Sequence, residues 1–182
     1  MRPLERWFLA RWRAQTLAYL PENSRILEIG SGTGLNFRFY PSGAHGVASE
    51  LSCEMLKVAA GKSRPEGLCL AQNSAEKLPF KDATFDAAFA TLVFCSVKSP
   101  AEAFAELRRV VKPAGPIVLL EHVRPGGLLG PIFDLLSLLT VSLFDDHCNR
   151  RTADEARRAG LCVEHIEKKA RGVFNLILLK NT

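Results

Sequence analysis

The chain has 182 residues, of which 47% are hydrophobic and 24% are charged, and its formal net charge is +5 at pH 7. These values are close to globular averages, so they exclude a disordered or fibrous protein, and a chain of this length buries enough surface to fold without a metal or a disulfide. The five cysteines are widely spaced and form no C-x-x-C pair, which argues against a zinc site and favours a reducing, cytoplasmic environment.

The excess of basic residues has two interpretations. A net positive charge can attract an anionic partner such as nucleic acid or a phospholipid surface. Here the Lys and Arg residues are scattered, and aromatic residues do not alternate with them as they do on a base-stacking surface. We therefore expect a solvated surface and no nucleic-acid partner.

The first element, residues 1–22, is predicted to be a helical cap. Its apolar residues recur at helical spacing with Arg and Glu between them, which is typical of an amphipathic helix. They are Leu4, Trp7, Phe8, Trp12 and Tyr19. The charges leave no apolar run long enough for a signal peptide or a membrane-spanning helix. We expect the helix to cover the sheet or a bound cofactor.

Seven short β-rich runs follow, and helical runs separate most of them. The predicted strands are residues 25–29, 46–49, 68–71, 85–91, 116–121, 161–167 and 173–179. This alternation is typical of parallel strands joined by helical crossovers. The sequence therefore predicts the α/β class, and it predicts a single domain over residues 1–182.

Two helices have clear start signals. The sequences SPAE at 99–102 and TADE at 152–155 both match the capping box, in which a Ser or Thr side chain caps the helix and an acidic residue follows three positions later. Gly160 is placed to end the second helix.

Residues 126–150 depart from the alternation and are predicted to form an apolar helical lid. Residues 128–144 are rich in Leu, Ile, Val and Phe, and Asp134 is their only charge. One interpretation is a buried helix over a substrate pocket, and the alternative is an interfacial surface in peripheral contact with membranes. The run is short for a spanning helix and contains Pro131.

The most informative motif is ILEIGSGTG at residues 26–34, an apolar strand that ends in three alternating glycines. Glycine permits a positive φ and lets the backbone approach a ligand closely. A dinucleotide fingerprint needs Gly or Ala at the sixth place, and here that place holds Leu35. Glu28, two residues before the first glycine, suits a cationic ligand group better than a pyrophosphate.

A second carboxylate strengthens this prediction. Glu50 ends the next predicted strand, where a carboxylate can accept hydrogen bonds from both ribose hydroxyls. The glycine loop and Glu50 together predict a nucleoside-binding crevice at the carboxyl ends of the strands.

Four motifs in order over residues 25–123 resemble those of class I S-adenosylmethionine-dependent methyltransferases. They are LEIGSGTG at 27–34, ELS and EML within 50–56, AEKLPF at 75–80, and LRRVVKP at 107–113 leading into Gly115. The resemblance implies a Rossmann-like fold, in which a seven-stranded, mostly parallel sheet has helices on both faces. It also implies S-adenosylmethionine as the cofactor.

The resemblance divides on the methyl acceptor. The second and third motifs are similar to those of the ubiquinone and menaquinone C-methyltransferases. Four other segments resemble the methyltransferase-like thiol methyltransferases, namely NFRFYP at 36–41, TLVFCSV at 91–97, EHV at 121–123 and LFDDHCN at 143–149. Bacterial phospholipid methyltransferases share the glycine loop. A thiol, a quinone-like molecule and a phospholipid amine all remain open as small, apolar acceptors.

The resemblance also assigns roles to residues of the cofactor site. Gly30, Ser31, Gly32 and Gly34 would wrap the methionine portion, Glu28 would serve its amino group directly or through water, and Glu50 would hold the ribose. Leu51 and Met55 would pack on the adenine, Ala75 would meet it through its backbone, and Thr91 would supply a backbone carbonyl near the amino group.

One position departs from the family pattern. Just before Ala75 the family commonly has an acidic residue for the adenine amino group, whereas this chain has Ser74 next to Asn73. A hydroxyl or a side-chain amide can accept that bond, but more weakly than a carboxylate. We expect a modest cofactor affinity.

A general base would help an acceptor that must lose a proton. His122 follows the fifth predicted strand and is the first candidate. Three further candidates follow the apolar segment, namely Asp145, Asp146 and His147. Of these, we predict Asp146 and His147 as candidate catalytic residues beside His122. Nothing in the spacing of these residues demands a metal, so no metal is expected.

Two other function classes stay open. The crevice can belong to a non-catalytic module that senses S-adenosylmethionine, or to an RNA-directed methyltransferase. The sequence TLVF at 91–94 lacks the signature of base-directed amino methyltransferases. Redox chemistry with NAD is disfavoured by Leu35. The expected location is cytoplasmic, or peripheral to a membrane through residues 128–144, and the sequence does not predict an oligomeric state.

Overall fold

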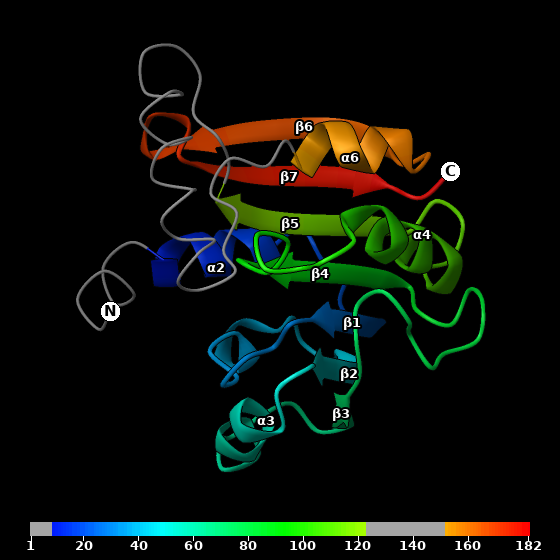
Figure 1. Ribbon diagram of the computed structural model, residues 1–182. Helices are drawn as coiled ribbons and strands as arrows, with labels where there is room; N and C mark the ends of the chain where they lie inside the picture. Colours follow the sequence, from blue (N-terminus) through cyan, green and yellow to red (C-terminus); the bar gives the residue numbers. More distant parts are fainter. Residues whose placement is uncertain (1–8, 123–151) are drawn as a thin grey trace.

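The computed structural model describes residues 9–122 and 152–182. Seven strands form one sheet in the order β3-β2-β1-β4-β5-β7-β6 (Figure 1). The strands are β1 Arg25–Ile29, β2 His45–Glu50, β3 Leu68–Gln72, β4 Ala87–Thr91, β5 Pro116–His122, β6 Cys162–Lys169 and β7 Phe174–Lys180. The pairs among β1 to β5 are parallel, and β7 is antiparallel to β5 and β6. The predicted mostly parallel, seven-stranded sheet is confirmed.

The predicted strand bounds agree with the observed ones to within two residues at each end. The largest difference at a strand start is Phe85, which we expected to begin the fourth strand. Phe85 instead forms an isolated bridge with Val111, and β4 begins at Ala87. The Phe85 ring is fully buried, so its apolar character reflects the core rather than the strand.

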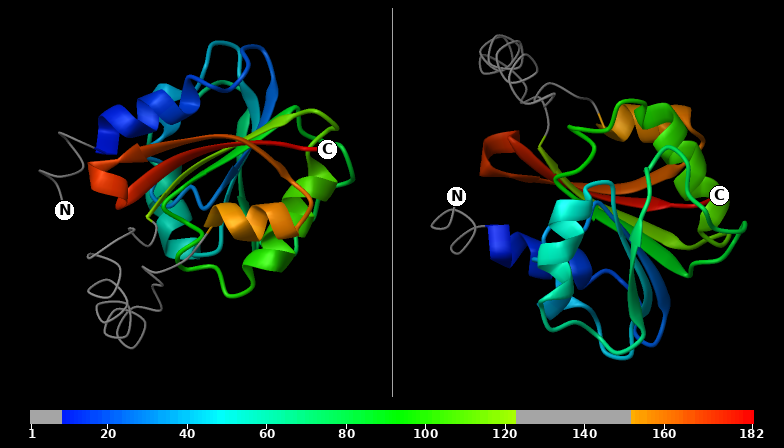
Figure 2. Two further views of the ribbon diagram at one scale, coloured as in Figure 1. Left: turned by 90° about the horizontal axis from the view of Figure 1, so that it is seen from above. Right: turned by 60° about the horizontal axis from the view of Figure 1, so that its bottom comes forward.

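Helices lie on both faces of the sheet, as predicted (Figure 2). The described helices are α2 Ala10–Leu17, α3 Cys53–Ala60, α4 Pro100–Val110 and α6 Thr152–Arg158, and the 3-10 turns are η2 Phe37–Phe39 and η3 Ala170–Gly172. Helices α4 and α6 cover one face through a core that includes Phe104 and Ala156. Helix α2, η2 and α3 cover the other face through two smaller cores that contain Leu17, Phe37 and Ala59.

Strand β1 shows why the sheet has two different faces. Successive side chains of a strand point to opposite sides. Leu27 and Ile29 therefore enter the core beneath α4, while Ile26 enters the core beneath α2. Glu28 points to the same side as Ile26 and is also fully buried. The face beneath α2 thus contains a buried carboxylate close to the start of the glycine loop.

The helix ends agree only in part with the predicted caps. Helix α4 begins after Ser99, but the Ser99 side chain makes no capping hydrogen bond, and Pro100 begins the helix instead. Helix α6 includes Thr152 itself. Gly160 has a φ of +87°, and the amides of Gly160 and Leu161 bond back to the carbonyls of Arg157 and Ala156. This confirms the predicted glycine-ended helix.

Helix α2 is the described part of the predicted cap at 1–22, and its buried side differs from the predicted one. Helix α2 buries Arg13, Thr16 and Leu17, whereas Tyr19 is 44% exposed just beyond the helix. The start of the predicted cap and the predicted lid at 126–150 fall outside the described residues. None of the helices that the structure does describe is both long enough and apolar enough to cross a membrane.

Candidate functional site

A pocket of about 910 Å³ opens at the carboxyl ends of the parallel strands. Its walls come from the glycine loop, the end of β2, the start of α3, the loops after β3 and β4, and the start of α4. Ligands of open α/β sheets bind outside the carboxyl ends of the strands, where the strand order reverses. Here the order reverses between β1 and β4, so the pocket lies where the fold favours a ligand.

The glycine loop has the backbone that the sequence predicted. Gly30, Gly32 and Gly34 all have a positive φ. A Cβ on Gly30 or Gly34 would collide with Val93 or Phe37, so these two glycines allow close internal packing. A Cβ on Gly32 would meet nothing within 4 Å. The backbone at Gly32 therefore leaves open space on the pocket side, where a ligand can approach it.

Glu50 is held rigidly at the end of β2. One carboxylate oxygen accepts a hydrogen bond from the Gly32 amide at 2.9 Å, and the other accepts one from the Ser52 amide at 2.9 Å. Ser52 also caps α3 by accepting from the Met55 amide. The carboxylate thus joins the glycine loop to α3, and each of its oxygens has a second lone pair for a ligand.

Glu28 does not line the pocket, although the sequence placed it there. Its carboxylate is fully buried and accepts hydrogen bonds from Asn36 Nδ2 at 2.6 Å and from the Tyr40 hydroxyl at 2.7 Å. Asn36 Nδ2 also donates to Thr91 Oγ1 at 2.9 Å. Glu28 was expected to serve a ligand amino group directly or through water, and here its carboxylate bonds Asn36, which in turn bonds Thr91 in the pocket lining.

The surroundings of Glu28 change its acidity. Burial raises the pKa of Glu28 to about 7, and the hydrogen bonds from Asn36 and Tyr40 and the charge of Arg13 oppose this rise only in part. Desolvation disfavours the charged form of a buried acid. The Glu28 carboxylate is therefore partly protonated near neutral pH.

Arg13 joins this buried group from α2. The Arg13 side chain donates from Nη1 to Asn36 Oδ1 at 3.0 Å and to Thr91 Oγ1 at 2.5 Å. Arg13 lines the pocket, as does Thr91. We refer to Arg13, Glu28, Asn36, Tyr40 and Thr91 as the polar floor of the site. Glu28 and Thr91 were expected from the sequence, whereas Arg13, Asn36 and Tyr40 were not assigned roles.

The loop after β3 contains the position where the family pattern is broken. The Ser74 hydroxyl donates to a carboxylate oxygen of Glu76 and also accepts from the Glu76 amide. The second oxygen of Glu76 accepts from the amides of Lys98 and Ser99. Asn73 has a different environment, since neither polar atom of its buried side chain has a partner. Of Asn73 and Ser74, it is therefore Asn73 whose side-chain donor and acceptor are both available to a ligand.

Contacts from the end of β5 shape the loop after β4. Glu121 is fully buried and accepts from the amides of Val93 and Phe94 at 3.1 and 3.2 Å. Leu92 has a φ of +60°, a conformation that is unfavourable for a residue with a side chain, and its amide donates to the Leu120 carbonyl at 2.7 Å. This loop forms one wall of the pocket, and its hydrogen bonds to Leu120 and Glu121 of β5 hold it in a strained conformation.

The structure places one of the candidate bases. His122 ends β5 and packs edge-on against the Phe174 ring, with the centroids 5.0 Å apart, but it does not line the pocket. Asp145, Asp146 and His147 lie outside the described residues. No group of three His, Cys, Asp or Glu side chains comes together for a metal within residues 9–122 and 152–182.

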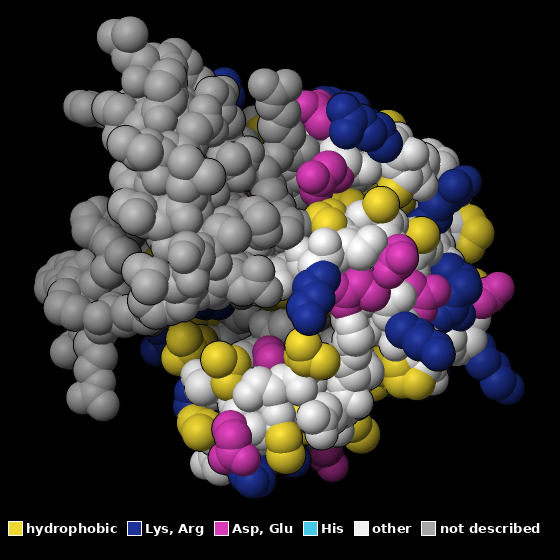
Figure 3. Space-filling model, viewed as in Figure 1, with side chains coloured by type: hydrophobic (Ala, Val, Ile, Leu, Met, Phe, Trp, Pro, Cys, Tyr) yellow, Lys and Arg dark blue, Asp and Glu magenta, His cyan; other side chains and the backbone are white. Residues whose placement is uncertain are grey.

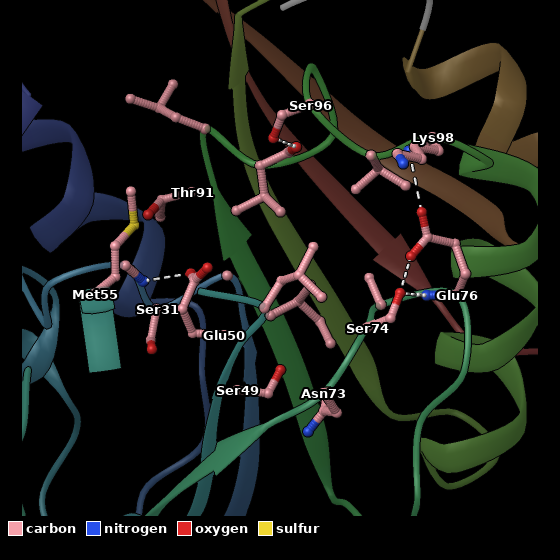
Figure 4. A pocket seen from close by; sticks show the side chains of 18 of the residues that line it. Ser31, Ser49, Glu50, Met55, Asn73, Ser74, Glu76, Thr91, Ser96 and Lys98 are labelled. Carbon is pink, nitrogen blue, oxygen red and sulfur yellow. Dashed lines mark hydrogen bonds between the residues drawn. The ribbon is translucent and has the colours of Figure 1, made fainter. Parts of the chain in front are cut away.

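Most of the predicted cofactor residues share the pocket. The lining includes Gly30, Ser31, Gly32, Glu50, Leu51, Met55, Ser74, Ala75 and Thr91, and it leaves out Glu28 and Gly34. Leu51 and Met55 are 66% and 46% exposed, so both present apolar surface at the pocket. In Figure 4, Ser31, Glu50, Met55 and Thr91 lie at one end of the pocket, and Glu76 and Lys98 lie at the other.

The surface around the site contains charges of both signs. On the face shown in Figure 3, Lys and Arg side chains are interspersed with Asp and Glu side chains across the described part of the molecule. The described residues also form ion pairs, such as those of Arg109 with Asp82 and Glu106.

Comparisons with known proteins agree on one family. Residues 27–119 match the model of a family described as a methyltransferase domain. The chain is 35% identical over 119 residues to a demethylmenaquinone methyltransferase of Renibacterium salmoninarum, a match over 63% of this chain and 49% of that protein. It is 36% identical over 104 residues to a thiol S-methyltransferase of Homo sapiens, a match over 54% of this chain and 42% of that protein. The chain spans about half the length of the curated relatives it matches.

A solved structure has the same fold. A SAM-dependent methyltransferase of Thermotoga maritima superimposes with a TM-score of 0.72 at 24% identity, over 100% of this chain and 95% of that one. At this level of identity the likeness concerns the fold.

Proposed function

The chain belongs to the methyltransferase-domain family, and on that premise we propose that it transfers the methyl group of S-adenosylmethionine to a small, apolar acceptor. The family and the fold imply this cofactor. The observation that supports the activity best is the pocket itself, in which the open backbone at Gly32 and the fixed Glu50 carboxylate lie side by side.

The residues of the pocket fit S-adenosylmethionine. The open space at Gly32 accommodates an amino-acid tail that runs along the loop backbone. The exposed side chains of Leu51 and Met55 offer an apolar surface for an adenine ring. The side-chain oxygen of Ser31 and both polar atoms of Asn73 are buried without a partner, and buried polar groups are normally hydrogen-bonded. A polar nucleoside supplies what these walls lack.

We assign the ribose to Glu50, whose two oxygens can accept from both hydroxyls. For the adenine we assign the polar contact to Asn73, because the Ser74 hydroxyl is already bonded to Glu76. A carboxamide offers a donor and an acceptor in one plane, which matches an adenine edge. Glu76 positions the two loops on either side of the adenine.

When bound, the cofactor supplies a methyl group on a positively charged sulfur. The acceptor would attack the methyl carbon in line, and the sulfur would leave as a neutral thioether. The protein then has mainly to align the acceptor, and such alignment contributes up to roughly 7–11 kcal/mol in favourable cases. A pocket of about 910 Å³ is near the upper end of the range for small-molecule sites, so an acceptor can enter beside the cofactor. A base contributes typically about 10²–10⁴-fold, and Asp146 and His147 remain candidates alongside His122.

The acceptor class follows from two lines of support. One match is to a demethylmenaquinone methyltransferase and another is to a thiol S-methyltransferase, which supports testing quinone-like and thiol acceptors. The apolar run at 128–144 also suits such a molecule. We propose thiols, quinols and phospholipid amines as the acceptor classes to test. We also propose that residues 1–182 form one domain, with residues 1–22 as its cap and residues 126–150 as its lid.

Isothermal titration with S-adenosylmethionine and S-adenosylhomocysteine tests the cofactor, and absence of binding to both would contradict the proposal. Glu50→Ala is expected to lower affinity by roughly 10-fold or more, since a ribose hydrogen bond to a charged group is lost. Asn73→Ala is expected to lower affinity more than the matched variant Ser74→Ala.

A radiolabelled-methyl assay over thiols, quinols and phospholipid amines tests catalysis and identifies the acceptor class. Binding without methyl transfer across that whole panel would instead favour a non-catalytic sensor.

A further inference from the structure

Thr91 ends β4 at the pocket, and its hydroxyl group is unusually constrained. Thr91 is only 5% exposed and lines the pocket. Its hydroxyl oxygen accepts two hydrogen bonds, one from Arg13 Nη1 at 2.5 Å and one from Asn36 Nδ2 at 2.9 Å. A hydroxyl has two acceptor lone pairs and one proton. Both lone pairs of the Thr91 hydroxyl are therefore used, and its proton has to point in a third direction.

The orientation of the Asn36 amide fixes this arrangement. Asn36 Oδ1 accepts from Arg13, whereas Asn36 Nδ2 donates to Glu28 and to Thr91. A reversed amide would set its N–H groups against a guanidinium, which has only donors. The atoms of Arg13 and Asn36 that face Thr91 are thus both donors, and neither can accept the Thr91 proton.

The Thr91 proton is therefore available to a ligand. Within residues 9–122 and 152–182, no group accepts a hydrogen bond from the Thr91 hydroxyl. Buried donors are normally bonded, so this proton calls for a partner in the pocket. The hydrogen bond from the Arg13 guanidinium polarises the hydroxyl and makes it a stronger donor. Thr91 is suited to a partner that carries a negative charge.

The place of Thr91 relates it to the methyl acceptor. Glu50 and the glycine loop, which we assign to the ribose and the amino-acid tail, follow β2 and β1, and β4 is the neighbour of β1 on the other side. The sulfur joins the ribose to the tail, so it lies at the end of the pocket where Figure 4 shows Thr91 with Ser31 and Glu50. The nucleoside occupies the β2 side of this end. The β4 side is then the one left for an acceptor that attacks in line.

The number of lone pairs decides which acceptors fit this donor. A thiolate sulfur or a phenolate oxygen has three lone pairs, so it can accept the Thr91 hydrogen bond and attack with another pair. A phenolate can also attack through a ring carbon while its oxygen keeps the hydrogen bond. A neutral amine has one lone pair, and a hydrogen bond from Thr91 would occupy the pair that has to attack.

The transfer to such an anion balances without a proton from Thr91. The acceptor has already lost its proton to a base or to solvent. An electron pair of the acceptor forms the bond to the methyl carbon, and the sulfur keeps the pair of the bond that breaks. The Thr91 hydroxyl orients the attacking group and stabilises its ionised form.

We propose that the Thr91 hydroxyl donates a hydrogen bond to the attacking group of the methyl acceptor, and that the site selects acceptors that react as a thiolate or a phenolate over amines. This inference rests on the proposed function. It narrows the three acceptor classes to thiols and quinols, and it gives the Thr91 side chain a role separate from that of its backbone carbonyl.

A coloured anion tests the proposal without methyl transfer. 4-Nitrophenol absorbs visible light strongly only as the phenolate, so its pKa can be read in the complex with S-adenosylhomocysteine. Thr91→Val keeps the shape of the side chain and removes the donor. It should lower the acid dissociation constant of bound 4-nitrophenol roughly 10-fold or more, since a hydrogen bond to a charged group is lost. Thr91→Ser should keep the value of the unaltered protein.

Ser96→Ala provides the matched control. Ser96 also lines the pocket, but its hydroxyl already donates to the Val93 carbonyl at 2.9 Å. This variant should leave the pKa of bound 4-nitrophenol unchanged. Isothermal titration then separates the acceptor from the cofactor, because Thr91→Val should bind S-adenosylhomocysteine as tightly as Thr91→Ser does.

Two acceptors with one scaffold test the selection itself. Phenylmethanethiol and benzylamine differ only in the group that attacks. A radiolabelled-methyl assay should show faster transfer to the thiol in the unaltered protein and in Thr91→Ser. Thr91→Val should lose roughly 10-fold or more in kcat/KM for the thiol, and its rate with the amine should not fall.

Four outcomes would overturn the inference. If bound 4-nitrophenol has the same pKa in Thr91→Val and in the unaltered protein, or if the unaltered protein does not bind the phenolate, the hydroxyl has no anionic partner. Weaker binding of S-adenosylhomocysteine by Thr91→Val than by Thr91→Ser would assign the hydroxyl to the cofactor tail. Transfer to benzylamine at least as fast as to phenylmethanethiol would contradict the selection. Absence of S-adenosylhomocysteine binding to the unaltered protein would overturn the proposed function as well, and this sets the two failures apart.

Discussion

Strand β1 sends alternate side chains into two different environments. On one side, Leu27 and Ile29 enter a large apolar core with Phe94 and Phe104, whose rings stack with centroids 4.4 Å apart. On the other side, Glu28 enters the polar floor and accepts hydrogen bonds from Asn36 and Tyr40, the two residues that flank η2. The same five-residue strand thus joins an apolar core to a polar network.

The two sides of β1 contribute differently, one to the stability of the domain and the other to the orientation of polar groups at the pocket. Apolar burial supplies stability in proportion to the area removed from water, and it depends little on direction. A buried carboxylate costs free energy to desolvate, and what it gains is a fixed orientation for its partners. The core side of β1 therefore stabilises the domain, and the polar floor orients Asn36, Thr91 and Arg13 at the pocket.

The largest effect is expected on the apolar side. Phe104→Ala should lower the free energy of unfolding by about 3–5 kcal/mol, because it leaves a cavity at a fully buried position. The loss should not vary with pH between 5 and 8, since no charge is involved. Urea denaturation at several pH values measures both quantities, with Phe104→Leu as the milder control. A loss below about 1 kcal/mol would mean that the core rearranges to fill the space.

On the polar side the expected effect depends on pH. The pKa of Glu28 is raised from 4.5 to about 7 in the folded protein, so the folded state binds a proton more tightly than the unfolded state. The contribution of Glu28 to stability is therefore greatest below pH 4.5 and declines as the pH rises through 7, by about 3 kcal/mol in total.

Glu28→Gln should abolish this decline. Relative to the unaltered protein, the variant should gain about 3 kcal/mol of unfolding free energy between pH 4 and pH 8. Denaturant titrations of both proteins across this range give the difference directly, and Glu22→Gln is a control at an exposed acid. A difference that stays constant with pH would show that the pKa of Glu28 is the same in the folded and unfolded states.

The smallest effect sharpens the contrast further. Tyr40→Phe keeps the ring that packs edge-on against Phe37 and Phe89 but removes the hydroxyl that donates to Glu28. Because that bond favours the charged carboxylate, the pKa of Glu28 should rise further, and the variant should lose about 1–2 kcal/mol at pH 8 and less at pH 5. Stability curves at the two pH values test this, and equal losses at both would mean that the hydroxyl does not favour the ionised form over the neutral one.

Local patterns in the sequence predicted the helices, strands and turns, because these elements depend mainly on residues that are close together in the chain. The short β-rich runs located the strands, and the glycines located the turn before Leu35. The capping box at Ser99 located the start of α4 correctly but not the capping contact. Pro100 already fits the first turn of a helix, so the helix begins there without the serine hydroxyl.

Long-range contacts explain what the sequence did not reveal. Arg13 and Thr91 are 78 positions apart in the chain, and no local pattern brings them together. One signal was present, namely that Arg13 falls on the helix face of Leu9 and Leu17. A single charge on an apolar helix face usually reaches out to solvent, so only the structure shows that this one turns toward a pocket.

The strand order has a consequence for how the chain is made. In the described sheet, β6 pairs only with β7, and β7 must insert between β5 and β6. While a ribosome is still adding β7, the long hydrogen-bonding edge of β5 has no protein partner, and its Ile117 to Leu120 segment is the kind that aggregates when exposed. Insertion of β7 therefore satisfies this edge of β5 and protects it from pairing with another chain.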